Sequence, residues 1–224
     1  MQGFHLVTGA SSGLGQAIAR FLLEQGKKVA LLGRDRARLC ALADAYSTVS
    51  LVLEVDVCER DALFAALEQA LNWEPELLSV YNCAGSGVFK PCEEYTSQDI
   101  DTTLGANLVG LIHVSQWAAQ TLGKGGQLIQ ILSTAATEGK AGESVYCAAK
   151  WGAKGFSLAL RDELKAKGIH VGLVYPGGMN TPFWQQDGRD ASGYMCVEQV
   201  AKMIVNNFGM DTELCCSDLV IRRR

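Results

Sequence analysis

The sequence predicts an α/β fold, built as a doubly wound parallel sheet of about seven strands with helices on both faces. Short apolar segments alternate from end to end with longer segments whose apolar residues recur at helical spacing. The apolar segments are nearly continuous, which is typical of strands buried on both faces of a parallel sheet. The 224 residues, of which 48% are hydrophobic, suffice for one buried core, so we expect residues 1–224 to form a single domain.

Each predicted element follows from one of these two patterns. Leu63, Leu67 and Leu71 recur every four positions, which is the spacing of one helix face, and residues 96–123 form a longer helical pattern. A long irregular stretch covers roughly residues 176–196. The predicted strands cover residues 4–8, 28–33, 49–55, 77–82, 126–132, 169–175 and 218–222.

Composition and charge exclude several kinds of partner. The formal net charge of −4 and the lack of a basic face argue against a nucleic-acid partner. No apolar run approaches the length of a membrane span, and the first residues do not resemble a signal segment. We therefore expect a cytoplasmic protein without a membrane partner. Positive charge clusters only at Arg222, Arg223 and Arg224, which we interpret as a solvated chain end.

The eight cysteines are spread along the chain, and none forms a C-x-x-C pair. The histidines, His5, His113 and His170, are also isolated, so we predict no metal site. Dispersed cysteines in a domain of this size are typical of a reducing compartment, where they pack as small apolar side chains.

A glycine-rich segment, TGASSGLG at residues 8–15, joins the first predicted strand to a helix. Glycines there let the backbone approach a pyrophosphate, and the helix N-terminus offers unpaired N–H groups. The spacing differs from the G-x-G-x-x-G fingerprint, and such a turn can be merely structural. The preceding strand and the following helix favour a Rossmann-type dinucleotide site. Its candidate contacts in this turn are Gly9, Ser11, Ser12, Gly13, Leu14 and Gly15.

The end of the second predicted strand bears on the choice of cofactor. Arg34 stands where NAD-binding proteins of this fold place an acidic residue, and a guanidinium suits the 2′-phosphate of NADP. Asp35 is the counter-argument, but we expect it to cap the next helix. Arg36 and Arg38 can equally be ordinary surface charges. The sequence therefore favours NADP (as NADPH), with NAD less favoured.

Tyr146 and Lys150 lie four positions apart in the segment SVYCAAKWG, on one predicted helix face. Lowering the pKa of a phenol by about three units requires about 4 kcal/mol of preference for the phenolate. One ammonium at about 4 Å supplies roughly that energy at an effective dielectric constant of about 20. We therefore predict that Lys150 acidifies Tyr146, and that Ser133, at the end of the fifth strand, holds the substrate oxygen. The alternative is an ordinary surface pair.

In the order and spacing of its motifs the chain resembles the short-chain dehydrogenase/reductase family, in its compact single-domain branch. The resemblance covers essentially the whole chain, and it departs at Cys83, where the family's N-N-A-G stretch has a second Asn. The matching residues are Gly9, Gly13 and Gly15 in the glycine turn, Asp56 and Val57 after the third strand, Asn82, Ala84 and Gly85 after the fourth, Asn107, Ser133, Tyr146 and Lys150, and Pro176, Gly177 and Thr181 in the P-G…T segment.

The resemblance implies a role for several of these residues. Tyr146 would be the general acid in reduction and the base in oxidation, and Lys150 would also bond the nicotinamide ribose. Asn107 would interrupt the long helix between Gly105 and Gly110 and position a water that relays protons. The family's helices also pair across symmetry axes, which implies a homodimer or homotetramer. The candidate interface residues are Leu111, Val114, Trp117, Trp151 and Phe156.

These patterns together predict an NADPH-dependent oxidoreductase acting on a small carbonyl or alcohol substrate. The alternative is a non-catalytic, NADP(H)-sensing regulatory protein on the same fold, which would not need the proton-transfer residues. Epimerases and dehydratases of nucleotide sugars usually carry a larger substrate domain than this length allows. Phe183 and Trp184 are expected to form an apolar wall of the pocket, or else to pack in the core. Further candidate lining residues are Ser86, Val88, Phe89, Ala135 and Glu143.

Overall fold

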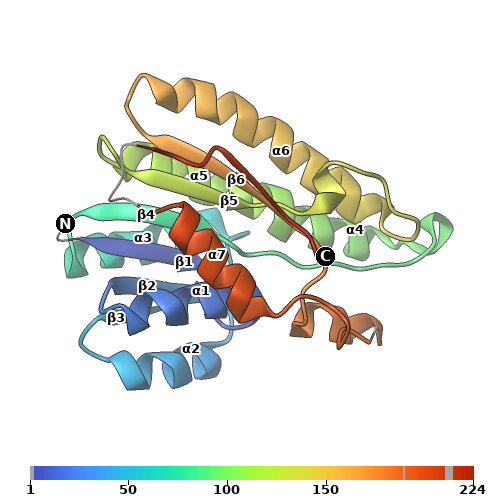
Figure 1. The fold of residues 1–224 in the computed structure, drawn as a ribbon, viewed down its shortest axis with the longest axis horizontal. Coiled ribbons are helices and arrows are strands. Elements are labelled where there is room, and N and C mark those ends of the chain that lie inside the picture. Colours follow the sequence, from blue (N-terminus) through green and yellow to red (C-terminus); the bar gives the residue numbers. More distant parts are fainter. Residues whose placement is uncertain (1–2, 189, 210–213) are drawn as a thin grey trace.

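One parallel sheet organises the protein, in a computed structural model that describes residues 3–188, 190–209 and 214–224. Within the described residues the sheet has seven strands in the order β3-β2-β1-β4-β5-β6-β7 (Figure 1). Every neighbouring pair is parallel. The strands are β1 (Phe4–Thr8), β2 (Lys28–Gly33), β3 (Ser50–Glu54), β4 (Leu77–Asn82), β5 (Gln127–Ile131), β6 (His170–Pro176) and β7 (Asp218–Ile221).

Helices connect the strands in the expected alternation. Short helical turns also occur, among them η4 (Thr134–Ala136) after β5 and η5 (Pro182–Asp187) in the stretch after β6. The α-helices are α1 (Gly13–Glu24), α2 (Arg36–Ala43), α3 (Arg60–Trp73), α4 (Ser97–Leu104), α5 (Gly110–Thr121), α6 (Ser144–Lys165) and α7 (Val197–Asn207).

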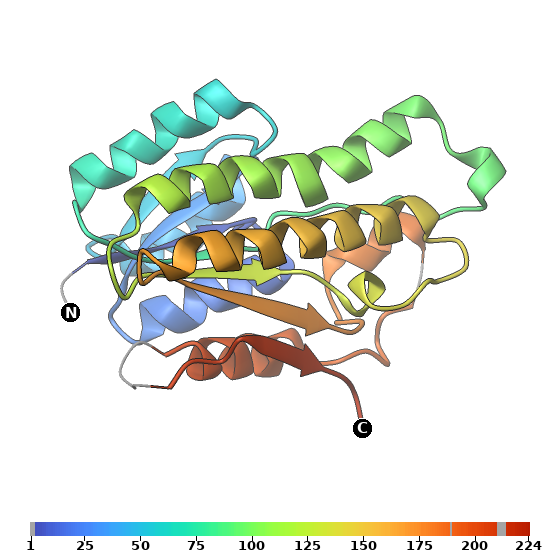
Figure 2. The ribbon, with the colours of Figure 1, turned by 90° about the horizontal axis from the view of Figure 1, so that it is seen from above.

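The sheet divides two apolar cores, one on each face. Alternate residues of a strand point to opposite faces, so Leu6 belongs to one core and its neighbour Val7 to the other. The first core packs under α3, α5 and α6, and the second under α1, α2 and α7. Figure 2 shows the first group of helices together on one side of the sheet. The predicted doubly wound fold is thereby confirmed.

The long helical pattern predicted over residues 96–123 is interrupted as expected. α4 ends at Leu104, a π-helical segment η3 (Gly105–Val109) follows, and α5 begins at Gly110. A side chain on Gly110 would collide with Val57, so the glycine lets the helix lie against the residues that follow β3. Asn107 lies in the middle of η3, where the regular hydrogen-bond ladder is broken.

The structure corrects part of the predicted subunit interface. Leu111, Val114 and Trp117 were expected to lie outside the core-facing stripe of their helix, but all three are buried in the first core. The π segment inserts an extra residue into its turn and so changes the direction in which the side chains of α5 face, which a straight helical pattern does not include. Trp151 remains exposed, while Phe156 is half-buried against the same core.

Candidate active site

A cavity of about 1220 Å³ opens at the carboxyl ends of the strands. This volume exceeds the usual range for a single small ligand, about 300 to 1,000 Å³. All but one of the predicted cofactor and catalytic residues line it, together with residues that follow β7. The cavity therefore lies where open α/β sheets bind their ligands.

The glycine turn at the end of β1 has the backbone that its sequence predicts. Gly9 and Gly13 have φ angles of 66° and 55°, in the left-handed region that other residues rarely adopt. A side chain on Gly15 would collide with the carbonyl of Gly9, so the turn requires glycine there as well. Ser12 precedes α1 without capping it through its side chain. The first N–H groups of α1 thus remain available to an anion in the cavity.

The arginines after β2 form the far end of the cavity. Arg34 is well exposed, and its Nη1 lies 3.6 Å from Oδ2 of Asp56. Asp35 accepts a hydrogen bond from the backbone N–H of Arg38 at 3.1 Å and also pairs with its side chain. The predicted helix cap is thus confirmed, and its carboxylate is engaged away from Arg34. The guanidinium of Arg34 and the carboxylate of Asp56 both line the cavity.

Asn82 is the predicted cofactor residue that does not line the cavity. Its side chain is buried, accepts a hydrogen bond from the Thr8 hydroxyl at 3.1 Å and donates one to the Leu111 carbonyl at 3.2 Å. The Thr8 oxygen in turn accepts hydrogen bonds from the backbone N–H groups of Cys83 and Ala84. Asn82 therefore fixes the ends of β1 and β4 relative to α5, and the backbone that follows it forms the cavity wall.

Tyr146 and Lys150 lie in the first two turns of α6, and both are buried. The Lys150 ammonium donates a hydrogen bond to the Ile131 carbonyl at 3.1 Å and lies 5.7 Å from the centre of the Tyr146 ring. Burial lowers the pKa of Lys150 to about 8. The Ser133 hydroxyl, which accepts from the Ala135 N–H, is also a hydrogen-bond partner of Tyr146.

The structure differs here from the prediction that Lys150 acidifies Tyr146. Burial raises the pKa of Tyr146 well above that of a free phenol, and the Ser133 hydrogen bond only partly opposes this shift. Burial outweighs the hydrogen bond from Ser133, and the ammonium of Lys150 donates to a carbonyl at the end of β5, 5.7 Å from the centre of the phenol ring. A buried ammonium needs a hydrogen-bond acceptor, and this carbonyl is the one it reaches. The site keeps the phenol in its protonated form.

Asn107 approaches Lys150 from the opposite helix. Its amide nitrogen donates to the carbonyls of Thr103, at 2.8 Å, and Ser86. Its side-chain oxygen is buried without a hydrogen-bond partner among the described residues. Gly85 separates the two groups, since a Cβ there would lie 2.7 Å from this oxygen and 3.9 Å from the Lys150 ammonium. A polar path along Asn107 and Lys150 therefore borders the cavity at a glycine.

A cluster of aromatic rings lies at one wall of the cavity. Phe89 contacts the rings of Tyr146, Phe183 and Trp184 at centroid distances of 5.4, 5.6 and 5.2 Å. Trp184 also contacts Tyr194. Phe183 and Trp184 line the cavity and pack against other rings, so both expectations for them hold in part.

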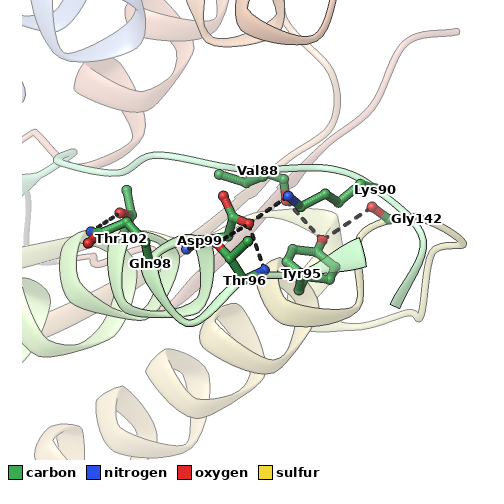
Figure 3. A network of polar contacts seen from close by, with 8 residues as sticks. All are labelled: Val88, Lys90, Tyr95, Thr96, Gln98, Asp99, Thr102 and Gly142. Atoms are coloured by element: carbon green, nitrogen blue, oxygen red, sulfur yellow. Dashed lines mark hydrogen bonds and ion pairs between the residues drawn. The ribbon is translucent and has the colours of Figure 1, made fainter. Parts of the chain in front are cut away.

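Of the other predicted lining residues, Ser86 and Glu143 face the cavity, whereas Val88, Phe89 and Ala135 do not. Phe89 and Ala135 pack behind the Tyr146 ring, because α6 turns that ring toward them. Figure 3 shows how the loop that carries Val88 is held. The Tyr95 hydroxyl donates to the Val88 carbonyl at 2.9 Å, and the Gly142 carbonyl lies 3.4 Å from the same hydroxyl oxygen.

One side of the cavity was not predicted from the sequence. Lys140, Arg222 and Arg223 line it, as do Glu138 and the thiol-bearing Cys83. The arginines had been interpreted as a solvated chain end, because only the strand order shows that β7 ends beside the site. Burial raises the pKa of the Cys83 thiol, which keeps it neutral. The sequence could have indicated that Cys83 lines the cavity, because this residue directly follows the fourth predicted strand.

Neither a membrane-crossing helix nor a metal-binding cluster occurs in the described part of the chain. No helix there is both long and apolar enough to cross a membrane. No group of three or more His, Cys, Asp and Glu side chains among the same residues is placed to hold a metal ion.

Comparisons with known proteins agree with this geometry. The family model described as "short chain dehydrogenase" matches residues 4–192. The chain is 33% identical to "Serine 3-dehydrogenase" of Agrobacterium fabrum, over 82% of this chain and 74% of that protein. A short-chain dehydrogenase/reductase structure from Vibrio parahaemolyticus is 32% identical, with a TM-score of 0.87 and 99% and 97% of the two chains covered. A short-chain dehydrogenase structure from Burkholderia cenocepacia in complex with NADP is 28% identical, with a TM-score of 0.86 and 98% and 96% covered. The chain combines a cavity at the carboxyl ends of its strands with a glycine turn and a Tyr–Lys pair, and the family model matches most of its length. The protein therefore belongs to the short-chain dehydrogenase/reductase family of oxidoreductases.

Proposed function

We propose that the protein is an NADPH-dependent oxidoreductase that transfers hydride between NADP(H) and a small carbonyl or alcohol substrate. The observation that carries the proposal is that Tyr146, Ser133 and Lys150 meet at one wall of the cavity, with the tyrosine and lysine buried and the serine half-buried. A phenol beside a hydroxyl at the wall of a cavity can exchange a proton with a substrate oxygen. When bound, the reduced nicotinamide would supply the hydride.

The cavity fits a dinucleotide at both of its ends. The α1 N–H groups suit a pyrophosphate, because the Ser12 side chain does not cap them and the glycine turn before them lines the cavity. Arg34 suits a 2′-phosphate, since its guanidinium is exposed and the carboxylate of Asp35 is engaged with Arg38. The residues that would hold the cofactor are Gly9, Ser11, Ser12, Gly13, Leu14, Gly15, Arg34, Asp56, Val57, Ala84, Gly85, Tyr146, Lys150, Pro176, Gly177 and Thr181.

Tyr146 is the proposed general acid in the direction of reduction. Because burial keeps its hydroxyl protonated, the residue is ready to donate a proton to a substrate oxygen. Ser133 holds that oxygen against the phenol, and Lys150 returns a proton to the tyrosine along the buried side of the site. Asn107 positions this return path, and its unpartnered side-chain oxygen beside Gly85 supports that role.

The substrate class follows from the walls of the cavity. Phe183 and Trp184 give it an apolar side, which suits a short aliphatic aldehyde, ketone or diketone. The relative named "Serine 3-dehydrogenase" oxidises a small alcohol by its name, which is consistent with this class.

Assembly and location belong to the same proposal. Val109, Trp151 and Leu158 are large apolar side chains that are exposed on η3 and α6, and we infer that they cover one another in a homodimer or within a homotetramer. A cytoplasmic location, where the cysteines stay reduced, remains a prediction of the sequence.

The test is consumption of NADPH in the presence of a panel of small carbonyl compounds, including butane-2,3-dione. We expect turnover by the natural protein, and a loss of about 10²- to 10⁴-fold in kcat on Tyr146→Phe with the NADPH dissociation constant little changed. Tyr46→Phe, which changes a tyrosine remote from the cavity, is the matched control. Undiminished turnover by Tyr146→Phe would remove that residue from the mechanism. Tight NADPH binding without turnover on the whole panel would favour the regulatory alternative.

A further inference from the structure

We propose that Lys140, Arg222 and Arg223 form an anion-binding subsite, here called the cationic rim, and that the carbonyl substrate therefore carries a carboxylate. The inference rests on the proposed function, because it names the substrate class of the same cavity. All three side chains line that cavity, on the side away from the glycine turn.

The backbone brings the chain end to the cavity. β7 lies beside β6 at one edge of the sheet, and its last carbonyl, that of Ile221, accepts a hydrogen bond from the Gly177 N–H at 2.9 Å. The two residues that follow thus leave the sheet beside Gly177, which is a predicted cofactor contact. Figure 1 shows the chain end on the side of the sheet where the connection from β5 to α6 also lies.

The side chains of the rim are held on the substrate side. Arg223 donates to the Gly193 carbonyl, and Arg222 lies 3.7 Å from Glu138. The Lys140 ammonium donates to the Thr134 hydroxyl at 3.0 Å, one residue from Ser133. The rim is thereby tied to the segment that presents the proposed oxygen-binding hydroxyl.

The rim has hydrogen-bond donors left for a ligand. A guanidinium carries five N–H groups, and among the described residues Arg223 donates one to Gly193, while Arg222 is paired with Glu138 only at 3.7 Å. The Arg222 side chain is 57% exposed, so it can turn toward an incoming anion. A planar guanidinium matches a carboxylate in two parallel hydrogen bonds.

The rim is too far from the glycine turn to hold the pyrophosphate of a dinucleotide. β1 and β7 are separated by four strand spacings of about 4.8 Å each, hence by about 19 Å. A pyrophosphate held at the glycine turn would lie at the other end of the cavity, so we assign the rim to the substrate.

Two carboxylates at the same mouth favour a singly charged ligand. Glu138 pairs with Arg222, and Glu143 is buried at the start of α6. Both would repel a phosphate dianion more strongly than a carboxylate. We therefore assign the subsite to a carboxylate monoanion.

The experiment compares short aliphatic oxo acids with their amides as substrates for NADPH-dependent reduction. We expect kcat/KM for the best oxo acid to exceed that of its amide by roughly tenfold or more, as a charge-assisted pair implies. The double variant Arg222→Gln/Arg223→Gln, and separately Lys140→Gln, should lower this ratio, whereas Arg60→Gln on α3, outside the cavity, should not. Added salt should lower the ratio as well, because the rim is partly exposed. Equal use of acid and amide by the natural protein would overturn the subsite and leave the proposed function standing.

A binding measurement separates the two proposals. Calorimetric titration of the protein with butyrate and with butyramide, in the presence of NADP⁺, measures the two binding affinities without any turnover. Tighter binding of butyrate that the double variant abolishes would support the subsite, even if no carbonyl compound were reduced. Equal binding of the two ligands would overturn it.

Discussion

At the scale of single residues, burial decides the charge of the proposed proton-transfer pair. Removal from water disfavours a charged group, so the same cause raises the pKa of Tyr146 and lowers that of Lys150 to about 8. As a result the ammonium of Lys150 loses its proton more readily than the phenol of Tyr146 does. A phenol that keeps its proton next to an ammonium that gives one up readily suits repeated donation to a substrate.

Arg34 carries the residue-scale prediction about the cofactor. Arg34→Asp should reduce kcat/KM with NADPH by about 10- to 100-fold, because it removes a charge-assisted pair with the 2′-phosphate and adds repulsion from a carboxylate. The measurement is the ratio of kcat/KM for NADPH to that for NADH. Arg60→Gln, whose side chain lies against Phe64 on α3, is the control that should leave the ratio unchanged. An unchanged ratio in Arg34→Asp would mean that another group selects the cofactor.

At the scale of elements, Tyr95 holds together the loop that follows β4 and the loop that precedes α6, beside the site. The loop after β4 carries Phe89, and the connection that carries Gly142 leads into α6, two residues before Tyr146. The Tyr95 hydroxyl lies within hydrogen-bond distance of a carbonyl of each (Figure 3). Lys90 and Asp99 reinforce the loop with an ion pair at 2.6 Å, which helps to lower the pKa of Asp99 to about 2. These contacts set Phe89 edge-on against the Tyr146 ring.

The prediction at this scale concerns the loss of the Tyr95 hydroxyl and of its contacts with the two loops. Tyr95→Phe removes the hydroxyl but keeps the ring, so stability should fall by only about 1 kcal/mol. KM for the carbonyl substrate should rise several-fold while the dissociation constant of NADPH changes little, because the affected wall is on the substrate side. Steady-state kinetics and denaturant unfolding measure the two effects. Equal changes in substrate and cofactor affinity would show that Tyr95 acts on the fold as a whole.

The elements themselves were the part that the sequence predicted well. The observed strands differ from the predicted ones by at most one residue at either end. Their buried apolar runs have a single possible place in a sheet covered on both faces. The position of the π segment followed from the family resemblance at Asn107, whereas the changed direction of the α5 side chains did not, and Leu111, Val114 and Trp117 were misplaced for that reason.

At the scale of the whole molecule, stability depends on a buried histidine far from the site. The His5 ring on β1 shares a 2.7 Å hydrogen bond with Ser79 on β4, and both residues are buried. Burial, with a smaller contribution from the charge of Lys27, lowers the pKa of His5 to about 4. Its ordinary pKa is about 6.5, so the unfolded chain binds a proton in a range where the folded one does not.

The sign of the pH dependence follows from that difference. The stabilisation is complete above about pH 6.5 and is lost progressively as the pH falls to about 4, for a total of roughly 3 kcal/mol. Urea unfolding at several pH values, followed by tryptophan fluorescence, should show this slope. His5→Gln should flatten the slope of stability against pH, whereas the control His170→Gln, at the first residue of β6, should not. An unaltered slope in His5→Gln would assign the acid sensitivity to other groups.

Assembly is the second prediction at this scale. Trp151 is 49% exposed on α6, and Leu158 is exposed two turns further along the same face. Trp151→Glu should convert the proposed dimer into a monomer, because it places a charge in an apolar contact. Sedimentation velocity at micromolar concentration measures the change, with Trp73→Phe on α3 as the control. A natural protein that sediments as a monomer would reject the proposed assembly.

What the sequence by itself determined is local: the order of strands and helices, the glycine turn, the helix cap at Asp35, and the residues that a family motif marks. These depend on spacing along the chain, on backbone freedom and on propensity, all of which neighbouring residues set. Only the tertiary structure decided which groups share a site and in what state. It placed β7 beside β6 and thereby brought Arg222 and Arg223 to the cavity. It also turned the Lys150 ammonium to a carbonyl, and burial then kept the Tyr146 phenol protonated, because desolvation depends on every element packed around a group.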